Sequence, residues 1–153
     1  MDQLVVRPAV DADAESARAL IRELGYGGLD AQTFSRGFAA VLADSTQRAW
    51  VAEKDGQVVG LMSLSVRPQL RLGGSIVTID EIVVTEHARG KGIGTRLLEF
   101  AKAEAARVGA RRLELHTARR LPSYARGFYT RNGFTEIDSA VMRWEGGVSV
   151  VVR

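Results

Sequence analysis

The stretch EHARGKGIGTRLLEF, at residues 86–100, places three glycines directly before a helix-like run. Glycine costs roughly 0.5–1 kcal/mol relative to alanine inside a helix or strand, but it adopts positive φ and lets a ligand approach the backbone closely. The first N–H groups of a helix are unpaired and carry partial positive charge. The stretch therefore predicts a cradle for a phosphate or pyrophosphate group, to which Arg89 and Lys91 add positive charge.

Regular secondary structure is predicted on both sides of this glycine loop. SIVTIDEIVV (residues 75–84) is rich in β-branched residues, as strands are. Apolar residues recur with helical spacing from about Gly94 to Val108, and RRLELH (residues 111–116) is a further strand. A strand, a crossover helix and a strand form a β-α-β unit, so we expect strands 75–84 and 111–116 to be parallel.

The rest of the chain predicts a mixed α/β or α+β domain. The central sheet is expected to be mostly antiparallel and flanked by about four helices. Asp55-Gly56 between two apolar runs is a strong hairpin signal. The other expected elements are strand 4–8, helices from Asp11 or Asp13 to Leu24 and over 30–43, a loop at 67–74, a helix at 123–132, and one or two closing strands at 134–145.

Length and composition fit one domain, with boundaries at 1–145. The chain has 153 residues, of which 46% are hydrophobic and 25% charged. The tail, residues 146–153, is apolar and β-prone. It could add a strand to a partner subunit, form a strand within the chain, or be a frayed end. A homodimer is the expected assembly.

Composition also excludes several classes of function. The absence of cysteine rules out disulfides, thiolate zinc and a cysteine nucleophile, and fits a cytoplasmic protein. Two separated histidines predict no metal site. Interleaved acidic and basic residues argue against nucleic acid as a partner. No apolar run approaches the ~20 residues that span a membrane, and the N-terminus lacks the pattern of a signal peptide.

Three kinds of phosphate-binding loop compete for the glycines. The P-loop pattern GxxxxGK[ST] is absent, and the dinucleotide pattern GxGxxG fails because the spacing here is GxGxG, far from the first strand. The pattern [QR]xxGx[GA] is satisfied by Arg89, Gly92 and Gly94. With FYTRNGF at residues 128–134, similar to [FL]YxxxGF, the chain resembles the GNAT superfamily of N-acetyltransferases over nearly its whole length.

This resemblance implies direct acetyl transfer from acetyl-coenzyme A to an amine. The strand backbone before the loop would then bind the pantetheine arm and the acetyl oxygen, and the loop would surround the pyrophosphate. The residues implied are Ile82, Val83 and Val84 for the strand, and Arg89, Gly90, Lys91, Gly92, Ile93, Gly94 and Thr95 for the loop. One departure concerns Pro122, which stands seven residues before Tyr129, where many family members carry Asn.

The resemblance also implies the acid and base. An alkylamine has a pKa near 10.4 and must lose a proton before it attacks. We expect Glu81 to be the base, with Asp80 as the second choice. Because adjacent strand residues face opposite sides, we expect only one of them to face the acceptor. Tyr129, matched to the family motif, would be the general acid that protonates the leaving thiolate.

The acceptor is less defined. In the family it is usually held by segments equivalent to residues 20–38 and 67–74, which contain Arg36, Arg67 and Arg71 and so favour a small anionic amine. LIREL, DGQVVGLMSL and ARGFYTRNGF resemble the bacterial aminoalkylphosphonate N-acetyltransferases, which have a histidine-rich stretch where this chain has RPQLRLGG. A protein or peptide acetyltransferase and a non-catalytic acetyl-coenzyme A sensor remain as alternatives.

Overall fold

The computed structural model describes residues 3–26 and 28–146. The chain divides into two compact units, Met1–Ala118 and Arg119–Arg153, and each unit is described by itself. The strands, all in the first unit, are β1 (Leu4–Pro8), β2 (Gln47–Lys54), β3 (Gln57–Gln69), β4 (Gly74–Val84) and β5 (Arg112–Leu115). The helices are α1 (Ala14–Glu23), α2 (Ala31–Ala43), α3 (Ile93–Arg107), α4 (Pro122–Ala125) and α5 (Phe128–Arg131), with short 3-10 helices η1 (Asp11–Asp13), η2 (Leu70–Leu72) and η3 (Glu86–Ala88).

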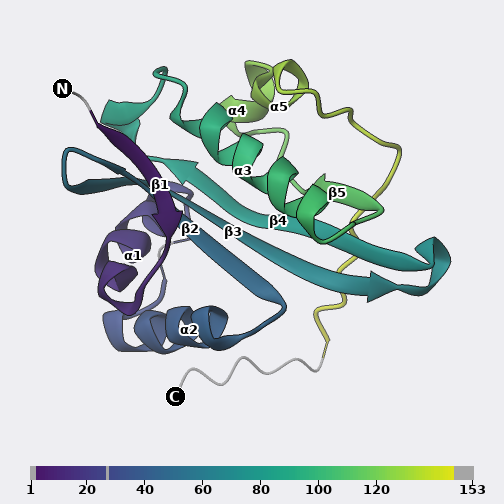
Figure 1. The fold of residues 1–153 in the computed structure, drawn as a ribbon, viewed down its shortest axis with the longest axis horizontal. Helices are drawn as coiled ribbons and strands as arrows, with labels where there is room; N and C mark the ends of the chain where they lie inside the picture. Colours follow the sequence, from purple (N-terminus) through teal and green to yellow (C-terminus); the bar gives the residue numbers. More distant parts are fainter. Residues whose placement is uncertain (1–2, 27, 147–153) are drawn as a thin grey trace. The chain divides into compact units, whose positions relative to one another are not determined.

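The strands form one sheet in the order β1-β2-β3-β4-β5 (Figure 1). Neighbours from β1 to β4 are antiparallel, and β4 and β5 are parallel, with Ile76 opposite Arg112 and Ile79 opposite Leu115. The predicted mixed fold and its parallel pair are confirmed. The crossover through α3 is the reason for the parallel pair, because two parallel strands need a long connection.

Two hairpins shape this sheet. In the first, Asp55 and Gly56 have φ of +50° and +78°, as a two-residue turn of this kind requires, which confirms the prediction. The second is longer than predicted. The expected loop at 67–74 is wrong, because β3 continues to Gln69 and pairs with β4 down to Gly74, which leaves only η2 and Gly73 as the turn. Cross-strand pairing there overrides the turn signal of Pro68, whereas Gly73, with φ of +58°, stays in the turn.

Helices cover both faces of the sheet. A cluster of buried residues joins α1 and α2 to one face, and it includes Leu20, Phe38, Val51 and Leu61. On the other face lies α3, whose residues Leu97, Leu98 and Ala101 are fully buried (Figure 1). Since strand side chains alternate, the odd-numbered positions of β3 beyond Leu61 face α1 and α2.

Gly60 lets α3 pack closely on β3. A Cβ at this position would lie 3.1 Å from Ala52 Cβ and 3.3 Å from Leu97 Cδ1. We expect Gly60→Val to lower the free energy of unfolding by about 1–3 kcal/mol, because overpacking forces these neighbours apart. Urea unfolding measures the change. Gly37→Ala in α2 is the matched control, since a Cβ there meets nothing within 4 Å, and it should stabilise by roughly 0.5–1 kcal/mol. Equal effects would contradict the packing argument.

A buried carboxylate fixes the first turn against the sheet. Asp13 is 6% exposed and accepts two hydrogen bonds from the Arg7 guanidinium, at 2.8 and 2.9 Å, and one from the N–H of Val10 at 2.9 Å. Arg7 also donates to Glu53 on β2 at 3.0 Å. The hydrogen bonds from Arg7, opposed by burial, hold the pKa of Asp13 below its usual value.

We expect Asp13→Asn to lower the free energy of unfolding by about 1.5–3 kcal/mol at pH 7, since charge-assisted hydrogen bonds to Arg7 are lost. A carboxylate whose folded pKa is depressed stabilises the fold above its unfolded pKa. That contribution is lost as the pH falls through the folded pKa, here below 3.8. Denaturation of the wild type and of Asp13→Asn should therefore show a smaller difference in the free energy of unfolding at pH 3 than at pH 7. A constant difference would mean that Asp13 acts through packing alone.

The second unit differs from the prediction. The single helix expected at 123–132 is two short helices, α4 and α5, separated by Gly127 with φ of +70°. The closing strands expected at 134–145 are wrong, since the described residues there form no strand. A local sequence pattern is not enough to form a strand, because a strand also needs a neighbouring strand to which its backbone can hydrogen-bond. The predicted strand in the tail falls largely on residues 147–153, outside the described residues, and the homodimer stays a prediction.

Candidate active site

The glycine loop leads from β4 through η3 into α3. Gly90 and Gly92 have φ of +74° and +81°, a region that residues with a Cβ rarely adopt. A Cβ on either residue would meet nothing within 4 Å. Backbone conformation, not crowding, therefore requires glycine at these two positions, and the space beside them is open to a ligand.

The start of α3 offers backbone donors to that space. At the start of the helix, the N–H of Arg96 donates to the carbonyl oxygen of Gly92 at 3.0 Å. The N–H groups of Ile93, Gly94 and Thr95 precede it, and no side chain caps the helix within the described part of the chain. Three such donors at a helix N-terminus fit a phosphate group. The start of α3 thus offers a place for a phosphate group.

Arg89 is held by the protein itself. Its Nε donates to the carbonyl oxygen of Val84 at 2.9 Å, and its guanidinium lies 3.9 Å from Glu23 of α1. Glu23 also accepts from the N–H of Glu86 at 3.0 Å. Arg89 therefore braces the loop against β4 and α1 in this structure, and its predicted contact with the pyrophosphate stays a prediction.

β4 carries a bulge next to the loop. Ser63 of β3 lies opposite Glu81, whereas Leu64 lies opposite Ile79, so Asp80 is an extra residue in β4. The ladder between β4 and β5 also ends at Ile79 and Leu115 in the described residues. Beyond that point Ile82, Val83 and Val84 pair with β3, and within the described residues no strand pairs with their other edge, where the Val84 carbonyl accepts from Arg89.

The bulge brings both predicted carboxylates to one face. Ser63 donates a hydrogen bond to Glu81, and Ser65 bonds to Asp80. Ser63 and Ser65 are two residues apart on β3 and share the face that carries α1 and α2. The expectation that only one carboxylate faces the acceptor side is therefore wrong, because the extra residue cancels the alternation of β4.

Both carboxylates have altered acidity. They are exposed by surface area, yet the surrounding protein removes part of their hydration, and this burial raises the pKa of Asp80 and the pKa of Glu81. Asp80 raises the pKa of Glu81 further by charge repulsion, while the Ser63 hydroxyl opposes the shift. The Ser65 hydroxyl and the charges of Arg67 and His116 oppose the shift at Asp80. A carboxylate tuned towards neutral pH suits general base catalysis.

We call these residues the β3–β4 polar cluster: Ser63, Ser65, Arg67, Asp80, Glu81 and His116. The sequence prediction included Arg67 and the two carboxylates but missed Ser63, Ser65 and His116. The sequence does carry a signal for the two serines. Polar residues at 63, 65 and 67 alternate with apolar residues, which indicates a strand with one polar face.

The other two arginines predicted to bind the acceptor, Arg36 and Arg71, lie outside the β3–β4 polar cluster. Arg36 is exposed on α2. Arg71 lies in η2, at the turn between β3 and β4. Six residue-to-residue steps along β4, at about 3.3 Å each, lead from Gly74 beside this turn to Asp80, so Arg71 lies roughly 20 Å along the strand from the carboxylates. The roles of both arginines in acceptor binding stay predictions.

Tyr129 belongs to the second unit. It is half-buried in α5, and its ring makes edge contacts with Phe128 and Phe134, with centroids 5.0 and 6.4 Å apart. These contacts fix the orientation of the ring within its unit. Pro122 begins α4, where its missing N–H costs no helical bond. The role of Tyr129 as general acid stays a prediction.

Within residues 3–26 and 28–146, no group of three or more His, Asp or Glu side chains could hold a metal ion. None of the helices described is both long and apolar enough to cross a lipid bilayer.

Comparisons with known proteins agree with this geometry. The model of the acetyltransferase (GNAT) family matches residues 15–134. An aminoalkylphosphonate N-acetyltransferase of Salmonella typhimurium is 39% identical over 131 residues, which cover 86% of this chain and 84% of that protein. The N-acetyltransferase YhfO of Bacillus subtilis is 31% identical over 86% of this chain and 89% of its own length.

Solved structures show the same fold. The aminoglycoside N-acetyltransferase AAC(6′)-Iy, solved in complex with coenzyme A, superposes with a TM-score of 0.83 at 17% identity and covers 95% of this chain and 97% of its own. A putative acetyltransferase of Agrobacterium tumefaciens superposes with a TM-score of 0.82 at 26% identity, over 92% of this chain and 99% of its own. With the matched family model and the 39% identical relative, this shows that the chain belongs to the acetyltransferase (GNAT) family and is an acyltransferase.

Proposed function

We propose that this enzyme transfers the acetyl group of acetyl-coenzyme A to the primary amine of a small anionic molecule of the aminoalkylphosphonate class. The observation that carries the proposal is the β3–β4 polar cluster beside the glycine loop. It combines two carboxylates with Arg67 and His116, whose charges act on Asp80. An aminoalkylphosphonate is a zwitterion, so its ammonium matches Asp80 and Glu81 and its phosphonate matches Arg67 and His116.

Each residue then has a defined task. The donors at Ile93, Gly94 and Thr95, with Gly90 and Gly92, hold the pyrophosphate, and the outer edge of β4 from Ile82 to Val84 aligns the pantetheine arm. Glu81 accepts a proton from the acceptor ammonium, directly or through water, and so frees the lone pair for attack on the thioester carbonyl. Tyr129 gives a proton to the departing thiolate.

The relatives support the acceptor class. The protein from Salmonella typhimurium, which covers most of this chain, is named for an aminoalkylphosphonate substrate. Polycationic acceptors such as aminoglycosides would face repulsion from Arg67 and His116. The likeness to the aminoglycoside enzyme, at 17% identity, concerns the fold alone.

Acceptor screening tests the function. Coenzyme A release from acetyl-coenzyme A should be measured with an aminoalkylphosphonate, an amino acid, a polyamine, an aminoglycoside and a peptide, and the acetylated product identified by mass. We expect the aminoalkylphosphonate to give the highest kcat/KM. The highest value on the peptide would replace the proposal with a protein acetyltransferase. Tight binding of acetyl-coenzyme A without turnover of any amine would favour a sensor.

Arg67→Gln should weaken binding of the acid group of the acceptor. Loss of a charge-assisted contact worth about 1.5–3 kcal/mol predicts a rise in KM for the aminoalkylphosphonate of roughly 10–100-fold, with a smaller effect on a neutral amine. Arg71→Gln is the matched control, because it removes the same charge at the far end of β4. A larger loss in Arg71→Gln would place the acid group near the turn instead.

A further inference from the structure

The carboxylate of Glu23 connects α1 to the turn that precedes the glycine loop. Glu23 is the last residue of α1, and Glu86, which lies 63 positions further along the chain, is the first residue of η3. Glu23 Oε1 accepts a hydrogen bond from the N–H of Glu86 at 3.0 Å. Both residues belong to the first unit. A single side chain of α1 therefore holds the start of η3.

This bond takes the place of a local cap. The first N–H groups of a helical turn have no partner within the turn, so a side chain, water or ligand must satisfy them. In the described part of the chain, Thr85 precedes η3 but does not cap it with its side chain. The N–H of Thr85 itself donates to the carbonyl oxygen of Val59 at 2.8 Å. Glu23 thus supplies from α1 the acceptor that a capping residue provides elsewhere.

Glu23 also approaches the other end of η3. The guanidinium of Arg89 lies 3.9 Å from the same carboxylate oxygen. The two side chains are 39% and 32% exposed, and ion pairs as accessible as this one contribute little. The N–H of Glu86 is therefore the main point at which Glu23 holds the turn.

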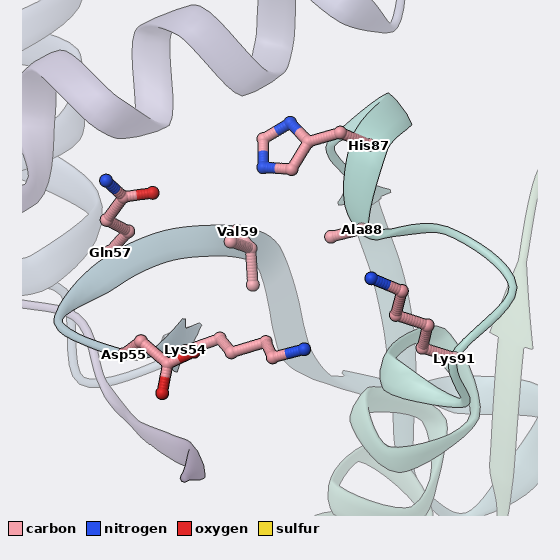
Figure 2. A pocket seen from close by; sticks show the side chains of 7 residues that line it. All are labelled: Lys54, Asp55, Gln57, Val59, His87, Ala88 and Lys91. Atoms are coloured by element: carbon pink, nitrogen blue, oxygen red, sulfur yellow. The ribbon is translucent and has the colours of Figure 1, made fainter. Parts of the chain in front are cut away.

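Packing gives η3 limited support. Among its three residues only Ala88 is buried, at 3% exposed. A pocket of about 210 Å³ separates η3 from the β2–β3 hairpin, and Figure 2 shows the side chains of His87 and Lys91 extending into this space. The rest of the lining is Lys54, Asp55, Gln57 and Val59. With one small side chain buried and a hollow beside it, the turn depends on its polar contacts.

The position of η3 sets where the glycine loop begins. Gly90 and Gly92 connect η3 to α3, and glycines restrict the backbone less than other residues do. The loop therefore depends on two fixed ends. Leu97 and Leu98, both fully buried, anchor the α3 end. The η3 end is anchored by Glu23.

We propose that Glu23 is a positioning residue for donor binding, which caps η3 from α1 and so holds the glycine loop in the conformation that receives the phosphate groups of acetyl-coenzyme A. This role rests on the proposed function, because it takes acetyl-coenzyme A as the donor. A carboxylate repels a phosphate, so Glu23 acts through Glu86 and Arg89 and not as a contact of the donor. A loop that is already ordered loses less conformational freedom when the donor binds, and affinity rises for that reason.

Two substitutions separate the cap from the charge. Glu23→Ala removes the acceptor and the charge, whereas Glu23→Gln removes the charge and keeps an oxygen that can accept from Glu86. Both variants free Arg89 from its ion pair, so the comparison between them isolates the cap. Isothermal titration calorimetry with acetyl-coenzyme A, without an amine, should give an affinity about fivefold or more weaker for Glu23→Ala than for Glu23→Gln, which corresponds to about 1 kcal/mol. Equal affinities would overturn the proposal.

Hydrogen exchange of the free, ¹⁵N-labelled protein gives a readout that needs no donor. The N–H groups of Ala88 and Arg89 donate to the carbonyl oxygens of Thr85 and Glu86 at 3.0 and 3.2 Å, so their protection reports whether η3 is formed. We expect both amides to exchange about fivefold or more faster in Glu23→Ala than in the wild type or Glu23→Gln, because the turn opens more often without its cap. Unchanged exchange would overturn the cap.

Glu15→Ala is the matched control. Glu15 is exposed in the first turn of α1, about 12 Å along the helix from Glu23, so its substitution removes the same charge from the same helix. Donor affinity and the exchange of η3 should not change. An equal loss of affinity in Glu15→Ala would reduce the effect of Glu23 to the charge or stability of α1 and would also overturn the proposal.

This proposal and the proposed function fail in different ways. If Glu23→Ala binds the donor as well as Glu23→Gln while the wild type acetylates an amine, the acetyl transfer stands and the role of Glu23 is wrong. If the wild type binds no acetyl-coenzyme A, the proposed function is wrong, and the role of Glu23 in donor binding is wrong with it.

Discussion

Glu81→Gln is expected to lower kcat/KM by about 10²–10⁴-fold, the usual contribution of a positioned general base. The amide keeps the shape of the side chain and can still bond to Ser63, but it cannot accept the proton of the ammonium. Steady-state coenzyme A release, measured with a saturating donor, gives the value.

The pH dependence of the same reaction separates catalysis from structure. Burial raises the pKa of Glu81 above its usual value of 4.5, so the base is lost at a higher pH than for an ordinary glutamate. Wild-type kcat/KM should therefore fall on the acid side with an apparent pKa above 4.5, in addition to the slope that the acceptor amine contributes. Glu81→Gln should lose this ionisation and keep only the slope of the amine.

Asp80→Asn is the comparison that decides between the two carboxylates. Asp80 is the extra residue of the bulge and shares the face of Glu81. The charges of Arg67 and His116 partly offset the rise in the pKa of Asp80 that burial causes. We expect its loss to be at least tenfold smaller than that of Glu81→Gln. The opposite order would make Asp80 the base and Glu81 its neighbour.

Tyr129→Phe should lower kcat by about 10²-fold or more, because the leaving thiolate loses its proton donor. The ring contacts with Phe128 and Phe134 survive this change. Single-turnover kinetics with saturating acetyl-coenzyme A measure the chemical step.

Tyr124→Phe is the control for Tyr129. The Tyr124 hydroxyl donates to Glu136 at 2.6 Å, and Arg119 donates to the same carboxylate, so this tyrosine already has a structural partner. We expect Tyr124→Phe to affect stability and to leave kcat within about twofold. A larger loss of kcat in Tyr124→Phe than in Tyr129→Phe would transfer the acid role to Tyr124.

Local patterns predicted much of this fold. The Asp55-Gly56 turn, the β-branched run of β4 and the apolar stripe of α3 each depend on residues near in sequence. The long β3–β4 hairpin was missed, because its ladder runs through Pro68 and leaves only η2 and Gly73 as the turn. The closing strands predicted at 134–145 are absent from the described residues, because a local sequence pattern does not specify a pairing partner.

The features of the candidate site also differ in whether the sequence alone predicts them. The role of Gly90 and Gly92 could be predicted, since positive φ values favour glycine and glycines are visible in the sequence. The bulge at Asp80 could not be predicted, because it is a shift in the pairing register of β3 and β4, and the sequence of either strand alone does not specify that register. The approach of Ser65, Arg67 and His116 to Asp80 depends on that bulge and on three strands at once. The contact between Glu23 and Glu86 joins residues 63 positions apart and has no sequence signature.

The most direct test compares two acceptors that differ only in the acid group. Coenzyme A release should be measured with 2-aminoethylphosphonate and with propylamine, under the same donor concentration and pH. The account predicts a kcat/KM at least about 100-fold higher for the phosphonate, which corresponds to about 2.7 kcal/mol of differential binding. Equal values, or a preference for propylamine, would contradict the claim that the β3–β4 polar cluster selects an anionic amine.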